Sequence, residues 1–283
     1  MIRFGMHSCL WTGSWTVPAA EHLIPQAARH GLELVEVPLL TPEAIDVEHT
    51  VKLFKEHGIA PSASICLPPG DAAALYPDRG ERFVMRALEV AHALGCTFLG
   101  GVTYSSLGWK SGKPPVEEEY ANIAAALRPV ARRAQELGMK LGLEPCNRYE
   151  THLINTAEQC VAMIERIGEP NVVCHLDTYH MNIEEKGFGN GFRTAGKHCS
   201  YVHMSESDRG VPGTGNVDFE DILRTMAQIG FDGDLVIESF IALPPEIAAA
   251  LCVWRPVARS ADEVLTRGVP YLKGLARVVG LIP

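Results

Sequence analysis

The sequence predicts an α/β fold in which a single (β/α)8 TIM barrel accounts for residues 1–283. Three observations carry that prediction: a glycine recurs between helix-like and strand-like segments, a short apolar run follows each such glycine, and an amphipathic stretch precedes most of them. The recurring glycines are Gly31, Gly58, Gly95, Gly138, Gly168, Gly196 and Gly230. Because glycine is favoured just past a helix C-terminus, these seven joints divide the chain into eight strand-then-helix units.

Eight strands are expected in chain order, each placed to within about two to four residues. They lie near residues 2–8, 32–39, 60–67, 97–104, 140–146, 172–178, 199–204 and 234–240. Two of the helices show a clear apolar stripe, one through Phe83, Ala87, Leu88, Ala91 and Leu94, the other through Ile123, Leu127, Val130, Ala134 and Leu137. A doubly wound open sheet is the competing fold, but it normally carries a glycine-rich phosphate loop after the first strand, and MHSCLWTGSW is not one.

The connections between these elements also carry signals. Asp218, with Asp221 three residues later, resembles a helix start close to a capping box. Pro114 with Pro115, the glycine-rich segment 187–196 and the segment 241–259 are expected to be loops over the barrel mouth.

Composition excludes several classes of function. The 283 residues are 47% hydrophobic and 21% charged, with a net charge of −9, which argues against a nucleic-acid partner. No stretch reaches the roughly 18 apolar residues that span a bilayer, and the start MIRFGMHSCLW lacks a basic region followed by a longer apolar one, so a cytoplasmic protein is expected. The eight cysteines are scattered without CxxC spacing, which indicates reduced thiols, and none is assigned to a metal.

Four strand-like runs end on an acidic or imidazole side chain: KLGLE on Glu144, VVCHLD on Asp177, SYVH on His203 and DLVIE on Glu238. An apolar strand has little reason to end on a buried charge unless that end of the sheet faces something positive. In a barrel the C-terminal strand ends converge on the active-site face, so these neighbours can surround one point. Three carboxylates and one imidazole form a mostly oxygen shell that suits Mn²⁺, Mg²⁺ or Co²⁺. Each residue alone could be an ordinary hydrogen-bonded residue; the pattern across four successive strands predicts one metal site.

A second set of polar groups follows these anchors. Glu150, His180 and Arg209 lie six, three and six residues after Glu144, Asp177 and His203. Above a metal they could hydrogen-bond a polyhydroxylated substrate. Loop solvation and salt bridging are the alternative for each.

The chain resembles the ketose 3-epimerases of the xylose-isomerase-like barrel superfamily, which include D-tagatose, D-psicose (allulose) and L-ribulose 3-epimerases. The segments that carry the resemblance are LEPCNRYETHLINT (143–156), HLDTYHMNIEE (175–185), HMSESDRG (203–210), PGTGNVDF (212–219), IESF (237–240) and VWR (253–255). The resemblance implies metal-dependent epimerisation of free ketoses at C3 through a cis-enediolate, with Mn²⁺ as the expected cofactor. It also implies a homodimer or homotetramer.

The resemblance assigns roles to the site residues. Glu144 and Glu238 would be the two proton-transfer groups, and Asp177 and His203 would be ligands only. Glu150, His180 and Arg209 would hold the O1 and O2 end of the sugar.

A less polar wall is expected around the remaining sugar carbons. Trp15, Trp109 and Phe240 could supply it, since aromatic faces pack against sugar C–H groups, although each could equally be core or rim. His7 stands where several relatives carry an aromatic residue, and Ser64 where some carry Cys; both bear on the identity of the substrate.

Several alternatives stay open. Hydroxypyruvate isomerase and inosose dehydratase have the same fold and similar strands ending on metal ligands. A DNA-repair endonuclease of the same superfamily needs more histidine ligands and a basic rim than this sequence offers. A sugar-sensing barrel without chemistry is disfavoured because both proposed proton carriers are present.

Overall fold

The computed structural model describes residues 2–241, 243 and 245–283, and its eight strands close into a parallel barrel in chain order. The strands are β1 Arg3–His7, β2 Leu34–Pro38, β3 Ala60–Leu67, β4 Phe98–Ser106, β5 Lys140–Leu143, β6 Val172–Asp177, β7 Cys199–His203 and β8 Asp234–Ile237. β1 pairs with β2 on one side and with β8 on the other, which closes the sheet. Each strand overlaps the range predicted for it, and the barrel fold is confirmed.

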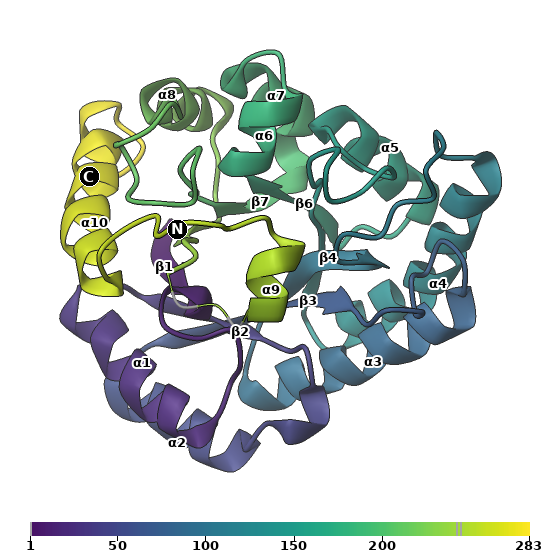
Figure 1. Ribbon diagram of the computed structural model, residues 1–283, viewed down its shortest axis with the longest axis horizontal. Helices are drawn as coiled ribbons and strands as arrows, with labels where there is room; N and C mark the ends of the chain where they lie inside the picture. Colours follow the sequence, from purple (N-terminus) through teal and green to yellow (C-terminus); the bar gives the residue numbers. More distant parts are fainter. Residues whose placement is uncertain (1, 242, 244) are drawn as a thin grey trace.

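Helices form a ring outside the barrel (Figure 1). In chain order the helices are α1 Val17–Arg29, α2 Val47–His57, α3 Pro77–Leu94, α4 Glu117–Glu136, α5 Ala157–Ile167, α6 Thr178–Glu184, α7 Phe188–Ala195, α8 Phe219–Ile229, α9 Pro245–Ala250 and α10 Ala261–Val278, and α9 does not belong to the ring. All seven recurring glycines have positive φ, and each lies at the C-terminal end of a helix. Asp218 caps α8 by accepting the backbone N–H of Asp221, as the sequence predicts. Pro114 and Pro115 lie in the non-helical segment before α4.

The prediction of a loop over residues 187–196 is wrong, because most of this segment is the helix α7. The helix packs against α5 and α8 in the outer ring. A Cβ atom on Gly189 would lie 2.7 Å from Thr225 Oγ1 of α8, and one on Gly191 would lie 2.7 Å from Met181 Cε of α6. These glycines therefore serve close helix packing and not the turn chemistry that the sequence predicts for this segment.

The segment 241–259 is not all loop either, since it contains the short helix α9. Residues 242 and 244 of this segment lie outside the described part of the chain. Ile247 of α9 and Leu251 just after it line the pocket at the barrel mouth, so α9 lies over that mouth (Figure 1).

The interior of the barrel changes from apolar to polar along its axis. An apolar layer of Leu34, Phe98, Val173, Tyr201 and Val236 fills the lower part, with the Phe98 and Tyr201 rings stacked 3.9 Å apart. Two residues further along several strands, the side chains become polar: Glu36 follows Leu34, His175 follows Val173 and His203 follows Tyr201. The period of two keeps these side chains inside the barrel, so polar groups gather at the C-terminal ends of the strands.

All eight cysteines are unpaired thiols in the structure. In the described part of the chain, no helix is both long enough and apolar enough to cross a membrane.

Candidate active site

The four strand-end residues predicted from the sequence lie together at the C-terminal end of the barrel. Asp177 and His203 are the last residues of β6 and β7, and Glu144 and Glu238 directly follow β5 and β8. All four are at least nine-tenths buried. Their meeting point is His203 Nδ1, which lies 3.4 Å from Glu144 Oε1, 3.6 Å from Asp177 Oδ2 and 3.5 Å from Glu238 Oε2.

The imidazole of His203 has its hydrogen on the far side of this meeting point. Nε2 lies 2.8 Å from Glu36 Oε2, and a carboxylate can only accept, so Nε2 donates. Nδ1 is buried and has no hydrogen-bond partner among the described residues. An orphaned nitrogen surrounded by three carboxylate oxygens fits a divalent cation, and the donor set suits Mn²⁺, Mg²⁺ or Co²⁺. These four residues would hold it.

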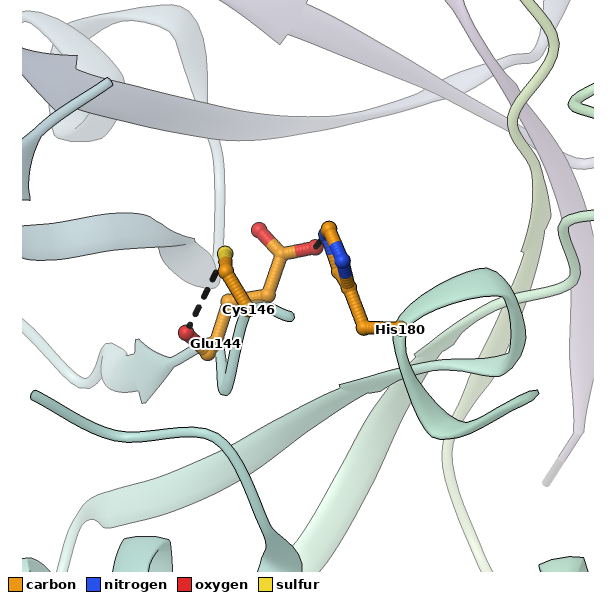
Figure 2. Close-up of side chains that lie close together, drawn as sticks. All are labelled: Glu144, Cys146 and His180. Carbon is orange, nitrogen blue, oxygen red and sulfur yellow. Dashed lines mark hydrogen bonds and ion pairs between the residues drawn. The ribbon is translucent and has the colours of Figure 1, made fainter. Parts of the chain in front are cut away.

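Two other groups of possible ligands adjoin this site, Glu144–Cys146–His180 and Glu144–His175–His203. Figure 2 shows the first: the Glu144 carboxylate points toward the His180 ring, while the Cys146 thiol points to the backbone oxygen of Glu144, 3.6 Å away. His180 Nδ1 accepts the backbone N–H of Asn147 at 3.1 Å, and His175 Nδ1 accepts that of Gly101 at 3.0 Å. The Nδ1 lone pairs of both rings are therefore already engaged. His175 carries its hydrogen on Nε2 when neutral, whereas His180 Nε2 lies 3.3 Å from Arg209 Nη2, itself a donor.

The pKa values of Glu144 and Glu238 are shifted in opposite directions. Burial raises the pKa of the Glu238 carboxyl, and the negative charges of Asp177 and Glu144 raise it further. The positive charges of His203 and Arg209 lower it by less than these effects raise it. Burial acts in the same direction on Glu144, but His175 and His203 outweigh it and lower its pKa. The site thus holds one carboxyl that keeps a proton more readily than the other.

The site also favours positive charge at His203. Burial alone would lower the pKa of its imidazole, yet the charges of Glu238 and Glu36 hold it well above the ordinary value. Positive charge is therefore stabilised where Nδ1 meets the carboxylates.

Arg209 is buried beside the metal-ligand candidates. Its guanidinium lies between two rings, 4.0 Å from the centroid of Tyr179 and 4.7 Å from that of Phe240. Nη1 donates to Asp177 Oδ2 and Glu238 Oε2, each at 2.5 Å. The residue sits in a left-handed turn with φ of 62°.

The loop that carries Arg209 is organised by a buried carboxylate. Glu206 accepts the backbone N–H groups of Ser207, Gly213 and Val217 at 2.8–3.0 Å. These three bonds fold residues 206–217 around one side chain, and Arg209 N–H closes the turn on the Glu206 carbonyl.

A pocket opens above the four residues. Six of the eight predicted substrate contacts line it: His7, Ser64, Glu150, His180, Arg209 and Phe240. Trp15 and Trp109 are outside its lining: the Trp15 ring stacks on Phe54 of α2, and Trp109 packs edge-on against His152. Trp15 also donates its indole N–H to Thr50 Oγ1 of α2, so its packing is toward the helix layer.

Glu36, His175 and Asn147 are site residues that strand-end reasoning missed. Glu36 and His175 each lie two residues before the end of a strand, and Asn147 lies after β5 and acts through its backbone N–H and its side-chain amide. A signal for Glu36 was available, since LELVEV places a carboxylate inside an apolar run, and a buried carboxylate in such a run needs a partner.

Comparison with known proteins gives a consistent result. The family model of the xylose isomerase-like TIM barrel matches residues 24–256. The L-ribulose 3-epimerase of Methylomonas sp. (strain DH-1) is 37% identical over 278 residues, covering 96% of this chain and 97% of the relative. The ketose 3-epimerase of Arthrobacter globiformis is 37% identical over 269 residues, covering 93% of each. The crystal structure of D-allulose 3-epimerase from Methylomonas sp. in complex with D-allulose superposes with a TM-score of 0.92 at 36% identity, covering 96% of each chain.

Proposed function

The chain belongs to the ketose 3-epimerases, carbohydrate epimerases of the xylose isomerase-like barrel family, and we propose that it epimerises free ketoses at C3 through a cis-enediolate. The observation that carries the proposal is the convergence of Glu144, Asp177 and Glu238 on the unpartnered Nδ1 of His203. Candidate substrate pairs are D-tagatose with D-sorbose, D-fructose with D-psicose, and L-ribulose with L-xylulose.

The reaction needs two acid/base groups on opposite faces of the sugar, because the C3 proton leaves one face and returns to the other. Glu144 and Glu238 are assigned to these roles. They follow β5 and β8, which are separated by β6 and β7 on one side of the barrel, so the carboxylates approach the meeting point from different directions. Their opposite pKa shifts support a cycle in which one carboxylate accepts the proton while the other carboxyl donates.

Glu144, Asp177, His203 and Glu238 are proposed to hold the cation, with Mn²⁺ preferred and Mg²⁺ or Co²⁺ as substitutes. Such a cation supplies Lewis-acid stabilisation of the negative charge that develops on the ketose oxygens. Arg209 adds a fixed positive charge at the same place.

Glu150, His180 and Arg209 are proposed to hold the O1 and O2 end of the sugar. His180 Nδ1 accepts the Asn147 N–H at 3.1 Å, and its Nε2 lies 3.3 Å from Arg209 Nη2 and 3.9 Å from Glu144 Oε1, so His180 and Arg209 act side by side there. Glu150 is held in place by the side-chain amide of Asn147 at 2.9 Å.

Phe240, His7 and Ser64 are proposed to contact the other end of the sugar. His7 Nδ1 accepts the Cys9 N–H, so Nε2 carries the hydrogen and faces Ser64 Oγ at 3.3 Å. Ser64 then has its own hydrogen free for a sugar hydroxyl.

Glutamine variants of the two glutamates test the proposal. With D-fructose, D-tagatose, D-psicose and L-ribulose as substrates, Glu144→Gln and Glu238→Gln are each expected to reduce epimerisation by about 10²–10⁴-fold, because each removes one proton carrier. In D2O, each variant should still exchange the C3 hydrogen of one epimer only, on the face that its remaining glutamate serves. The matched control is Glu119→Gln, the same change on α4, where Glu119 contacts His152 outside the pocket. Wild-type turnover in both site variants would contradict the assignment.

A further inference from the structure

A carboxylate with no assigned role lies beneath the metal-ligand candidates. Glu36 of β2 has no exposed surface. Its Oε2 accepts from His203 Nε2 at 2.8 Å and from the Tyr201 hydroxyl at 2.6 Å. Its Oε1 lies 3.5 Å from His7 Nε2 and has no hydrogen-bond partner among the described residues. One carboxylate therefore faces two imidazoles, one at the meeting point of the ligands and one in the pocket wall.

Glu36 is itself held rigidly from below. The Tyr201 hydroxyl also contacts Ser62 Oγ of β3 at 2.7 Å, and the Tyr201 ring is stacked on Phe98 in the apolar layer. A carboxylate buried in a barrel interior is costly unless hydrogen bonds satisfy it. The chain of contacts from Ser62 through Tyr201 to Glu36 fixes where its oxygens lie.

The consequence for His203 concerns its tautomer. Because Glu36 only accepts, it selects the form of His203 with hydrogen on Nε2 and a lone pair on Nδ1. That lone pair is aimed at the oxygens of Glu144, Asp177 and Glu238. The oxygens of Glu144, Asp177 and Glu238 would by themselves favour hydrogen on Nδ1, so Glu36 is the described group that favours hydrogen on Nε2.

The consequence for His7 concerns its orientation. The Cys9 N–H occupies Nδ1, so the Nε2–H must point to Glu36 and Ser64, at 3.5 and 3.3 Å. The two rings lie edge to face, with centroids 5.8 Å apart. A substitution of Glu36 is therefore expected to alter both His203 at the proposed cation site and His7 in the pocket wall.

We infer that Glu36 is a positioning residue that holds two histidines at once: His203 with Nδ1 turned to the cation, and His7 with its N–H turned to Ser64 in the sugar pocket. The inference rests on the proposed metal site. Its rival is that Glu36 only satisfies buried polar groups and stabilises the barrel.

Glu36→Gln separates these two roles because it keeps the size of the side chain. A glutamine amide can donate to His203 Nε2, which favours hydrogen on Nδ1 and removes the lone pair from the meeting point. The positioning role predicts that Mn²⁺ affinity, measured by titration calorimetry, falls by roughly 10–100-fold. It also predicts that the rise in melting temperature on adding Mn²⁺ shrinks, that turnover recovers at saturating Mn²⁺, and that KM for the ketose increases.

Two matched variants complete the design. Glu119→Gln makes the same change in another largely buried Glu–His pair, at 3.1 Å from His152, and should leave Mn²⁺ affinity unchanged. His7→Phe should alter KM for the ketose while Mn²⁺ affinity stays within about threefold of wild type, because His203 keeps its Glu36 partner.

Three outcomes overturn the inference. The first is wild-type Mn²⁺ affinity in Glu36→Gln, with a melting temperature lowered equally with and without Mn²⁺. The second applies even if that variant does not fold: nitrogen NMR of the Mg²⁺-loaded wild type should show His203 protonated on Nε2, and a hydrogen on Nδ1 instead contradicts the inference. The third is a wild type that binds no divalent cation, which removes the proposed metal site itself and is distinguishable from the other two.

Discussion

At the residue scale, backbone donors decide which histidine can bind a cation. His7, His175 and His180 each accept a backbone N–H at Nδ1, from Cys9, Gly101 and Asn147. His203 is instead held by Glu36 at Nε2, and it alone of these four histidines leaves Nδ1 without a partner. Of the four Nδ1 atoms, that of His203 is therefore the one left free to face the three carboxylates.

How far these residues can be predicted from sequence follows from the same contacts. Glu144, Asp177, His203 and Glu238 are predictable because apolar runs end on them and a barrel gathers strand ends. The histidine tautomers are not predictable in this way, because main-chain N–H groups contact three of the rings. Nearly every residue type has such a group, so the sequence does not mark the ones that matter. Residue type alone likewise does not predict that Trp15 packs on Phe54 and Trp109 on His152, because these contacts depend on tertiary neighbours.

Arg209→Lys tests the role of the guanidinium. Lysine keeps the charge but loses the planar contact with Tyr179 and Phe240 and the fixed bonds to Asp177 and Glu238. The loss of hydrogen bonds to charged groups, about 1.5–3 kcal/mol, corresponds to a fall in kcat/KM of roughly 10–100-fold. Steady-state kinetics on the preferred ketose measures it. Arg132→Lys is the control and should match wild type, because Arg132 is an exposed residue of α4 that pairs with Glu169 far from the pocket. Equal kinetics for both variants would exclude a specific role for the Arg209 guanidinium.

At the scale of the element, β4 approaches its neighbour more closely than a side chain allows. Gly101 has φ of 87°, and a Cβ there would lie 2.4 Å from the Ile65 carbonyl oxygen of β3. Its N–H donates to His175 and its carbonyl accepts the Glu144 N–H at 3.1 Å, so this glycine also supports the site.

Gly101→Ala and Gly70→Ala form a matched pair, because both glycines have φ near 88° but Gly70 has open space around it. Gly70→Ala is expected to lower the free energy of unfolding by about 1–2 kcal/mol, the cost of the left-handed backbone alone. Gly101→Ala should cost more than about 4 kcal/mol, because the clash with β3 adds to the same backbone cost. Chemical denaturation measures both; equal losses would show that the strand can move aside.

Elements differ in how well sequence predicts them. The seven glycine joints are predictable because a left-handed residue after a helix requires glycine chemistry. In α7 the same residue type serves close packing against α6 and α8, and only the tertiary neighbours, Thr225 and Met181, reveal that difference.

At the scale of the whole molecule, the proposed cation should stabilise the fold, because it binds residues that β5, β6, β7 and β8 bring together. A ligand at 100 times its Kd adds about 2.7 kcal/mol, or roughly 5 °C in melting temperature for a chain of this length. Calorimetry before and after chelation measures the shift.

Asp177→Asn provides the control for that shift. The asparagine oxygen can still cap α6, as Asp177 does by accepting the Tyr179 N–H at 2.6 Å, but it lacks the ligand charge. The Mn²⁺-dependent shift should disappear in this variant. An unchanged melting temperature after confirmed metal loss from the wild type would contradict the coupling of cation and fold.

Assembly and cellular location stay predictions from the sequence, a homodimer or homotetramer in the cytoplasm. Sedimentation equilibrium should give at least twice the chain mass of 30.8 kDa. A mass near that of one chain would show a monomer.

The most direct test of C3 epimerisation is an NMR time course in D2O with Mn²⁺ and the four ketoses, repeated after chelation, which follows the carbon where hydrogen exchanges. Deuterium should appear at C3 together with the C3 epimer, and both should disappear when the metal is removed. Deuterium at C1 with formation of an aldose, or no exchange with any ketose, would contradict the proposed reaction.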